Sequence, residues 1–206
     1  MLSTVRPLSA LVTMALCAAL VSSCSKSKES DAGKAQITPE QHAQAWNSSN
    51  QDGLSALSAG DLDKAEKLLL TSLSEAEACG PTDQRVAVSL NNLASVYEKK
   101  GMYDQCLPYL KRSRKILELT LPKDNRVVPV IIGNQARVLS EQGKYADAQP
   151  LYAEAVSAQD KAHSVELPDT MRGYAKVLKA LKRDAEAKTM EEMAASADEK
   201  NASAKK

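Results

Sequence analysis

The sequence predicts an all-α fold, an α-solenoid of about four stacked helix pairs. The main observation is an internal repeat, because residues 89–117 are followed by a second copy at residues 131–159 in which Gly143 stands 42 positions after Gly101. Repetition at this period is typical of supersecondary units that bury their apolar faces only when they stack on one another. The repeat therefore decides the fold class before any residue-by-residue propensity is considered.

Two further observations support the same class. Within the second unit, the small residues Ala94 and Cys106 lie on either side of Gly101, where two helices must cross closely and reverse direction. The junctions between units also recur, as Gly80–Pro81, Leu121–Pro122 and Leu167–Pro168. Proline forbids continuation of the preceding helix, so each junction is predicted to close one unit and open the next.

The first unit is predicted to begin at Thr38, because a threonine N-cap followed by Pro39 at the first helical position is a helix-start signature. Its turn lies near Gly60, and the second helix has an apolar stripe at helical spacing, formed by Ala65, Leu68, Leu69 and Leu73. The second unit extends to about Thr120. The fourth unit is three residues shorter than the period and has Lys182 where the turn glycine would stand.

Several of these motifs resemble a known family. The run Asn91–Ala94, the turn Gly143–Tyr145 and the helix start Gln149–Tyr152 are similar to the kinesin-light-chain-like branch of the tetratricopeptide repeats. The similar region covers roughly residues 41–194. The resemblance implies a non-catalytic protein in which the first helix of every unit lines a concave groove that holds an extended peptide.

The N-terminal residues 1–23 have the layout of an export signal, with Arg6 before a mostly apolar run. The run ends in small residues before Cys24, and this ending resembles the lipobox of bacterial lipoproteins, in which the cysteine is acylated after cleavage. The alternative is an ordinary secretory signal with a chance cysteine. We expect Cys24 to carry the lipid and to anchor the chain in a bacterial cell envelope. The residue after Cys24 is Ser25 and not aspartate, which resembles the signal that sends a lipoprotein on to the outer membrane of Gram-negative cells. We expect the protein to face the periplasm there.

The remaining chain divides by composition. Residues 24–38 are rich in Ser, Lys and small residues, so they predict a flexible tether. Residues 39–194 form the predicted repeat domain, and residues 195–206 are predicted to be a disordered tail because apolar periodicity ends there. The cysteines Cys79 and Cys106 are expected to be two free thiols, since a whole helix separates them and a disulfide needs Cα atoms within about 7 Å. We expect Cys106 to be buried and Cys79 to be the more reactive thiol.

Charge and motif content exclude several functions. Without the signal, which contributes only Arg6, the chain has 26 basic and 26 acidic side chains. Such a balance argues against a dedicated nucleic-acid binder. There is no phosphate-binding glycine loop, nucleophile elbow or HExxH sequence, and neither histidine has a ligand at metal-binding spacing. We therefore expect no enzyme activity, no cofactor and no metal.

The family resemblance gives the candidate binding residues. Aligning the units places toward the groove the side chains of Asn47, Asn50, Asn91, Asn92, Ser95, Asn134, Arg137, Arg172, Lys176 and Lys179. All of these except Asn47 and Lys179 are assigned to peptide binding. The trend along the groove runs from amides, which can bind a peptide backbone, to cations. Gly133 of the third repeat stands at the position that Asn91 occupies in the second repeat, so the third repeat departs from the pattern. The alternative is that these are simply solvated helix residues.

A second candidate surface is the basic cluster Lys111, Arg112, Arg114 and Lys115 on the second helix of the second repeat. It could attract anionic lipid or an acidic partner, but a convex face balanced by neighbouring acids is the favoured interpretation. The resulting hypothesis is a membrane-anchored adaptor or scaffold that binds a protein or extended peptide. The alternative is a pilotin-like assembly factor or chaperone for a secreted or outer-membrane subunit, and an envelope enzyme is a third class.

Overall fold

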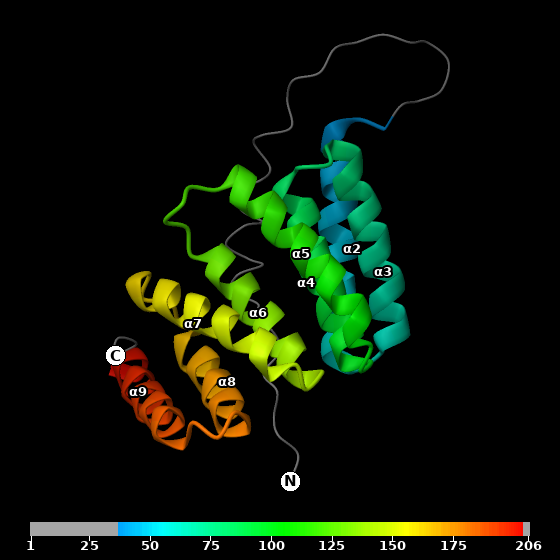
Figure 1. The fold of residues 1–206 in the computed structure, drawn as a ribbon. Coiled ribbons are helices and arrows are strands. Elements are labelled where there is room, and N and C mark those ends of the chain that lie inside the picture. Colours follow the sequence, from blue (N-terminus) through cyan, green and yellow to red (C-terminus); the bar gives the residue numbers. More distant parts are fainter. Residues whose placement is uncertain (1–36, 204–206) are drawn as a thin grey trace. The chain divides into compact units, whose positions relative to one another are not determined.

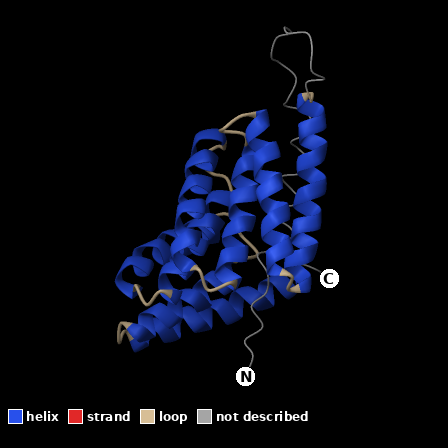
Figure 2. Ribbon diagram, turned by 90° about the vertical axis from the view of Figure 1, so that its right-hand side faces the viewer, coloured by secondary structure: helices blue, strands red, loops and turns tan. Residues whose placement is uncertain are grey.

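The computed structural model describes residues 37–203, and within that range it contains only helices, turns and loops. The all-α class is therefore confirmed. The helices are α2 (Pro39–Ala59), α3 (Leu62–Cys79), α4 (Gln84–Lys99), α5 (Tyr103–Thr120), α6 (Val127–Glu141), α7 (Tyr145–Lys161), α8 (Leu167–Ala180) and α9 (Asp184–Ser203). They form four antiparallel pairs of consecutive helices, as Figures 1 and 2 show.

The chain divides into two compact units, named unit 1 and unit 2, and each of them is larger than a single repeat. Unit 1 ends at Thr120 and contains α2 to α5, whereas unit 2 begins at Leu121 and contains α6 to α9. Each unit thus consists of two predicted repeats. In unit 1, α4 packs against α2, α3 and α5, and in unit 2, α8 packs against α6, α7 and α9.

The predicted helix start at Thr38 is confirmed. The Thr38 hydroxyl accepts a hydrogen bond from the Gln41 backbone N–H, and the Gln41 side chain accepts one from the Thr38 N–H. This reciprocal capping box satisfies two backbone donors that a helix end otherwise leaves unpaired. Asp61 caps α3 with a single bond, in which its carboxylate accepts from the Lys64 N–H.

The turns between paired helices are also as predicted. Gly60, Gly101, Gly143 and Lys182 follow the first helix of their pairs and have φ angles of 82°, 73°, 72° and 59°. The left-handed region costs a residue with a side chain roughly 1–2 kcal/mol. Lys182 therefore occupies the turn position at a conformational cost that the three glycines avoid.

Small residues allow the helices of a pair to approach closely. In the second pair, the Cys106 thiol is fully buried and donates to the Ala94 carbonyl oxygen at 3.3 Å. In the first pair, a Cβ at Gly53 would lie 2.7 Å from the Leu69 Cγ. The prediction that Ala94 and Cys106 mark a close crossing is confirmed.

The interior of unit 1 includes an entire stretch of α4. Every residue from Arg85 to Tyr97 is buried, so this helix has no solvent-facing stripe over about three and a half turns. Arg85 is tolerated there because its guanidinium binds both carboxylate oxygens of Asp83 at 2.8 and 2.9 Å. Burial alone would raise the pKa of Asp83, but the hydrogen bonds and charge of Arg85 hold that pKa below its usual value.

Unit 2 has a core of separate small clusters. Ala136, Ala148, Tyr152 and Val177 join α6, α7 and α8. Two more clusters join α8 to α9, and they consist of Ala175, Leu178 and Ala187, and of Leu167, Met171 and Ala194. Alanine dominates these contacts, so the helices are held at close range by small side chains.

The C-terminal end differs from the sequence prediction. Residues 195–203, predicted to begin a disordered tail at 195, continue α9 as far as Ser203. Ala194 is buried against Leu167 and Met171, and Asp198 forms a 2.7 Å ion pair with Arg172. These contacts hold the extension on α8, and its Ala-, Glu- and Lys-rich composition favours a helix without any apolar stripe.

The expectations for the export signal, Cys24 and most of the tether concern residues 1–36, which lie outside the described residues. Within residues 37–203, none of the helices is both long enough and apolar enough to span a bilayer.

Candidate peptide-binding faces

The candidate residues lie on the first helix of each pair, and they differ sharply between the units. In unit 1, Asn50 on α2 and Asn91, Asn92 and Ser95 on α4 are only 1–8% exposed. In unit 2, Asn134 on α6 is also buried, whereas Arg137 is partly exposed and Arg172 and Lys176 on α8 are exposed. Solvent therefore reaches the cations of the predicted set more readily than its amides.

The buried amides of unit 1 bind to one another. The Asn92 side-chain Nδ2 donates to the Asn50 Oδ1 at 2.8 Å, and this bond joins α2 to α4. The Ser95 hydroxyl donates to the Asn91 backbone carbonyl at 3.1 Å. A peptide that used the Asn50 or Asn92 amide would have to replace an existing buried hydrogen bond, so the net gain would be small.

A second polar network lies beside this pair. The Trp46 indole N–H donates to the Ser89 hydroxyl at 2.9 Å, and the Ser72 and Ser89 hydroxyls are 2.8 Å apart. It connects α2, α3 and α4 inside unit 1. Because every member is buried, each hydrogen bond replaces one that water would have made, and the network fixes how the three helices pack.

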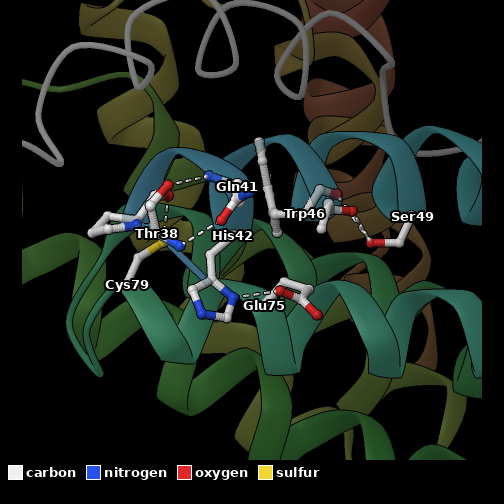
Figure 3. A network of polar contacts seen from close by, with 9 residues as sticks. Thr38, Gln41, His42, Trp46, Ser49, Glu75 and Cys79 are labelled. Carbon is white, nitrogen blue, oxygen red and sulfur yellow. Dashed lines mark hydrogen bonds and ion pairs between the residues drawn. The ribbon is translucent and has the colours of Figure 1, made fainter. Parts of the chain in front are cut away.

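The N-terminal end of unit 1 gives His42 a structural partner. Figure 3 shows the ring of His42 pointing toward Glu75, with Nδ1 and Oε2 separated by 2.6 Å. Across the same end of the helix pair, the Cys79 thiol donates to the Pro39 carbonyl at 3.8 Å. No group of three His, Cys, Asp or Glu residues among the described part of the chain could hold a metal ion.

One charged cluster in unit 1 was not anticipated from the sequence. Lys100 binds Glu66 and Asp63 at 2.6 Å each, and the Tyr97 hydroxyl donates to Glu66 at 2.6 Å. Hydrogen bonding from Lys100 lowers the pKa of both carboxyl groups, and burial with the Glu66 contact raises the pKa of Tyr97. The cluster joins α3 to the end of α4, and its members are too far apart in sequence to show any pattern.

Two cations in unit 2 are sequence neighbours of residues in one buried cluster. Ala136 of α6 and Val177 of α8 belong to one buried cluster, with Arg137 following the first residue and Lys176 preceding the second. Burial lowers the pKa of the Arg137 guanidinium, while the nearby Tyr152 and Glu141 oppose that effect. Burial also raises the pKa of Tyr152 to about 12, so its hydroxyl is protonated at neutral pH.

The cations of α8 differ in how they are paired. Arg172 binds Asp169 of its own helix and Asp198 of α9, and Lys179 binds Glu191 of α9 at 2.6 Å. Lys176 forms no ion pair within residues 37–203. Because exposed pairs contribute little, Arg172 and Lys179 can exchange their partners for a ligand at small cost.

The basic cluster of α5 is partly balanced. Arg112 binds Glu77 of α3 at 2.6 Å, and Arg114 binds Glu118 at 2.6 Å. The favoured interpretation, a face balanced by acids of the neighbouring repeats, fits Arg112, whereas the partner of Arg114 belongs to the same helix. Lys111 and Lys115 are exposed.

The match to a known family lies in the part of the sequence that forms unit 1. Residues 43–118 match the tetratricopeptide-repeat family model. No curated protein gives a significant sequence match to the chain. Solved structures extend the likeness to both units. BtubC (BKLC) from P. vanneervenii is 15% identical, with a TM-score of 0.71 over 91% of this chain and 72% of that one.

Two other structures are similar. The nearly identical TPR-like repeats of a Podosopora anserina protein, described as of kinesin-light-chain type, are 17% identical, with a TM-score of 0.62 over 93% of this chain and 88% of that one. MamA of MSR-1 is also 17% identical, with a TM-score of 0.53 over 92% and 91%. At these identities the likeness establishes the fold alone, an all-α repeat solenoid whose structural neighbours include kinesin-light-chain-like tetratricopeptide-repeat proteins.

Proposed function

We propose that the protein is a non-catalytic adaptor that binds an extended acidic segment of a protein partner, chiefly through the first helices of unit 2. The observation that carries the proposal is the surface of α8, where Arg172, Lys176 and Lys179 are exposed at helical spacing. Tetratricopeptide solenoids generally serve as interaction scaffolds, and their curved faces suit extended ligands. The structural neighbours support this general role.

The chemistry favours an acidic ligand. Lys176 offers a cation without an internal ion pair in the described part, and Arg172 can form the two-pronged contact that carboxylates accept. Asp169, Asp198 and Glu191 already occupy Arg172 and Lys179, which supports carboxylates as the matching groups. Because all these groups face solvent, binding should weaken as ionic strength rises.

The test is a pulldown followed by a titration. The full chain is used to capture partners from solubilised envelope proteins, and the recovered partner is titrated against wild type, Lys176→Ala and Arg172→Ala at low and high salt. We expect each variant to weaken binding several-fold, with a smaller loss at high salt. Lys111→Ala is the matched control, since it removes an exposed lysine from α5. Weakening by Lys111→Ala alone would contradict the proposal and favour the basic cluster.

We also propose that Cys24 carries the lipid that anchors this adaptor to a bacterial membrane. The support is the apolar run that ends in small residues directly before this cysteine. Metabolic labelling with a fatty-acid analogue should mark wild type and leave Cys24→Ser unlabelled. Equal labelling of the two proteins would exclude the anchor without affecting the assignment of the binding face.

A further inference from the structure

The third repeat, α6 with α7, has glutamines at two positions where the second repeat, α4 with α5, has leucines. The two repeats align at an offset of 42 residues, so Leu93 and Leu117 correspond to Gln135 and Gln159. All four side chains are 4% exposed or less. Each glutamine therefore places an amide group where the second repeat buries a hydrocarbon side chain.

The two buried amides are incompletely hydrogen-bonded. The Gln159 Nε2 donates to the Pro129 carbonyl oxygen of α6 at 3.2 Å, but its Oε1 has no hydrogen-bond donor in the part of the chain that the structure describes. The Gln135 Nε2 likewise has no acceptor within residues 37–203. A buried amide atom without a partner raises the free energy of the closed repeat relative to an open form in which water binds that atom.

The C-terminal end of α7 has two further weaknesses. Ile116 of α5 is 4% exposed, whereas the corresponding residue of α7 is the smaller and partly exposed Ala158. Beyond the helix end, His163 has a φ angle of 50°, in the left-handed region that is unfavourable for a residue with a side chain. Less apolar burial and backbone strain therefore coincide with the incompletely bonded amide of Gln159.

The second repeat differs at a further position. The Ser113 hydroxyl of α5 is fully buried and donates to the Ala87 carbonyl oxygen of α4 at 2.8 Å. The residue that corresponds to Ser113 in α7 is Ala155, which has no side-chain donor. The second repeat thus has a buried side-chain hydrogen bond between its two helices that the third repeat cannot form at this position.

We propose that the third repeat is a conformational weak point, in which α7 separates from α6 from its C-terminal end while α4 and α5 stay closed. Folded proteins open in cooperative segments, and a segment with fewer favourable buried contacts opens more often. Gln135 and Gln159 set how often this repeat opens. The inference does not depend on the proposed ligand, and it gives the protein one repeat that can change conformation without unfolding of unit 1.

The experiment is hydrogen exchange of the full chain, followed by mass spectrometry of its peptides. The result is expressed as a protection factor, the ratio of intrinsic to observed exchange rate, so that different helices can be compared. The variants are Gln135→Leu and Gln159→Leu. Gln149→Leu is the matched control, because it makes the same change at a partly exposed position of α7. Circular dichroism confirms that each variant is folded.

In the wild type we expect protection factors about tenfold lower in α6 and α7 than in α4 and α5. Gln135→Leu should raise the protection of α6 and α7 about tenfold by removing a buried amide. Gln159→Leu should raise it less, because that change also removes the bond to Pro129. Equal protection of the two repeats in the wild type would overturn the inference. An effect of Gln149→Leu as large as that of Gln135→Leu would also overturn it.

The reverse substitution provides an independent check in unit 1. Leu93→Gln places an amide in the second repeat, so protection of α4 and α5 should fall about tenfold while that of α6 and α7 stays unchanged. Leu117→Gln makes the same test at the other position if Leu93→Gln does not fold. Wild-type protection of α4 and α5 in the folded variant would show that an amide at these positions does not control opening.

Discussion

Units 1 and 2 use the polar positions of their first helices in opposite ways. In unit 1, the amides Asn50 and Asn92 bind one another, and Trp46, Ser72 and Ser89 form a second buried network. In unit 2, α6 keeps Asn134 buried, but α8 presents Arg172 and Lys176 to solvent. The same repeat architecture therefore supports a polar core that fixes helix packing in one unit and a charged surface in the other.

The difference has a clear physical basis. Neutral amides and hydroxyls can be buried at moderate cost when they pair with one another, whereas an unpaired ammonium or guanidinium group cannot. Substitutions in unit 1 should therefore affect stability, and substitutions on α8 should affect binding.

The largest expected effect is that of Trp46→Ala. It removes a buried indole and the hydrogen bond that the indole N–H donates to the Ser89 hydroxyl, so the free energy of unfolding should fall by about 3–5 kcal/mol. Urea denaturation followed by circular dichroism measures this value. Arg172→Ala on exposed α8 is the comparison and should change stability by less than about 1 kcal/mol. Similar losses in the two variants would remove the distinction between the units.

The next effect is that of Asn92→Ala, which leaves the buried Asn50 Oδ1 without its donor. We expect a loss of about 1–3 kcal/mol in unfolding free energy. Because the two amides share one hydrogen bond, the double variant Asn50→Ala, Asn92→Ala should lose less than the sum of the single losses. Additive losses would show that the hydrogen bond between the two amides does not itself contribute to stability.

A smaller effect is expected at the turns. Lys182→Gly should stabilise the protein by about 0.5–1 kcal/mol, because glycine adopts the left-handed conformation without the steric cost of a side chain. The reverse change, Gly143→Lys, should destabilise it by about 1 kcal/mol. Thermal unfolding of the two variants measures both shifts, and shifts of the same sign would contradict the equivalence of these turns.

The last prediction concerns the thiols of unit 1 and is a difference in their reactivity. Burial raises the pKa of Cys106 to about 11, so this thiol is protonated at pH 8 and shielded by the close helix crossing. We expect iodoacetamide to label partly exposed Cys79 first and Cys106 only when the protein is unfolded. Peptide mapping by mass spectrometry distinguishes the sites. Faster labelling of Cys106 in the folded protein would show that unit 1 opens readily.

The sequence was sufficient for the features that depend on local pattern. The 42-residue repeat predicted the helix pairs, Thr38 predicted the first helix start, and the alignment placed Lys182 at a turn that needs a left-handed residue. These features follow from spacing and backbone chemistry alone. The site could be predicted only in part, because an asparagine that binds a peptide and one that binds another asparagine occupy the same helical position.

Other features depend on contacts between distant residues. The extension of α9 depends on Ala194 packing under Leu167 and on the ion pair of Asp198 with Arg172. The position of the Tyr152 hydroxyl depends on Gly173, which in the sequence is an isolated glycine within a helix. Neither contact has a periodic signal, so only the folded structure brings the partners together.

The most direct test of the account compares the side-chain amides of unit 1 with the backbone amides of α8 in one experiment. N-acetyl-tetraglutamate is titrated into the isotopically labelled full chain, and the Nδ2 signals of Asn50 and Asn92 are followed together with the backbone signals of Arg172 and Lys176. We predict that the α8 signals shift progressively while the two asparagine signals stay in place. Shifts of the asparagine signals with α8 unaffected would show that the amides of unit 1 bind the ligand and would contradict the account.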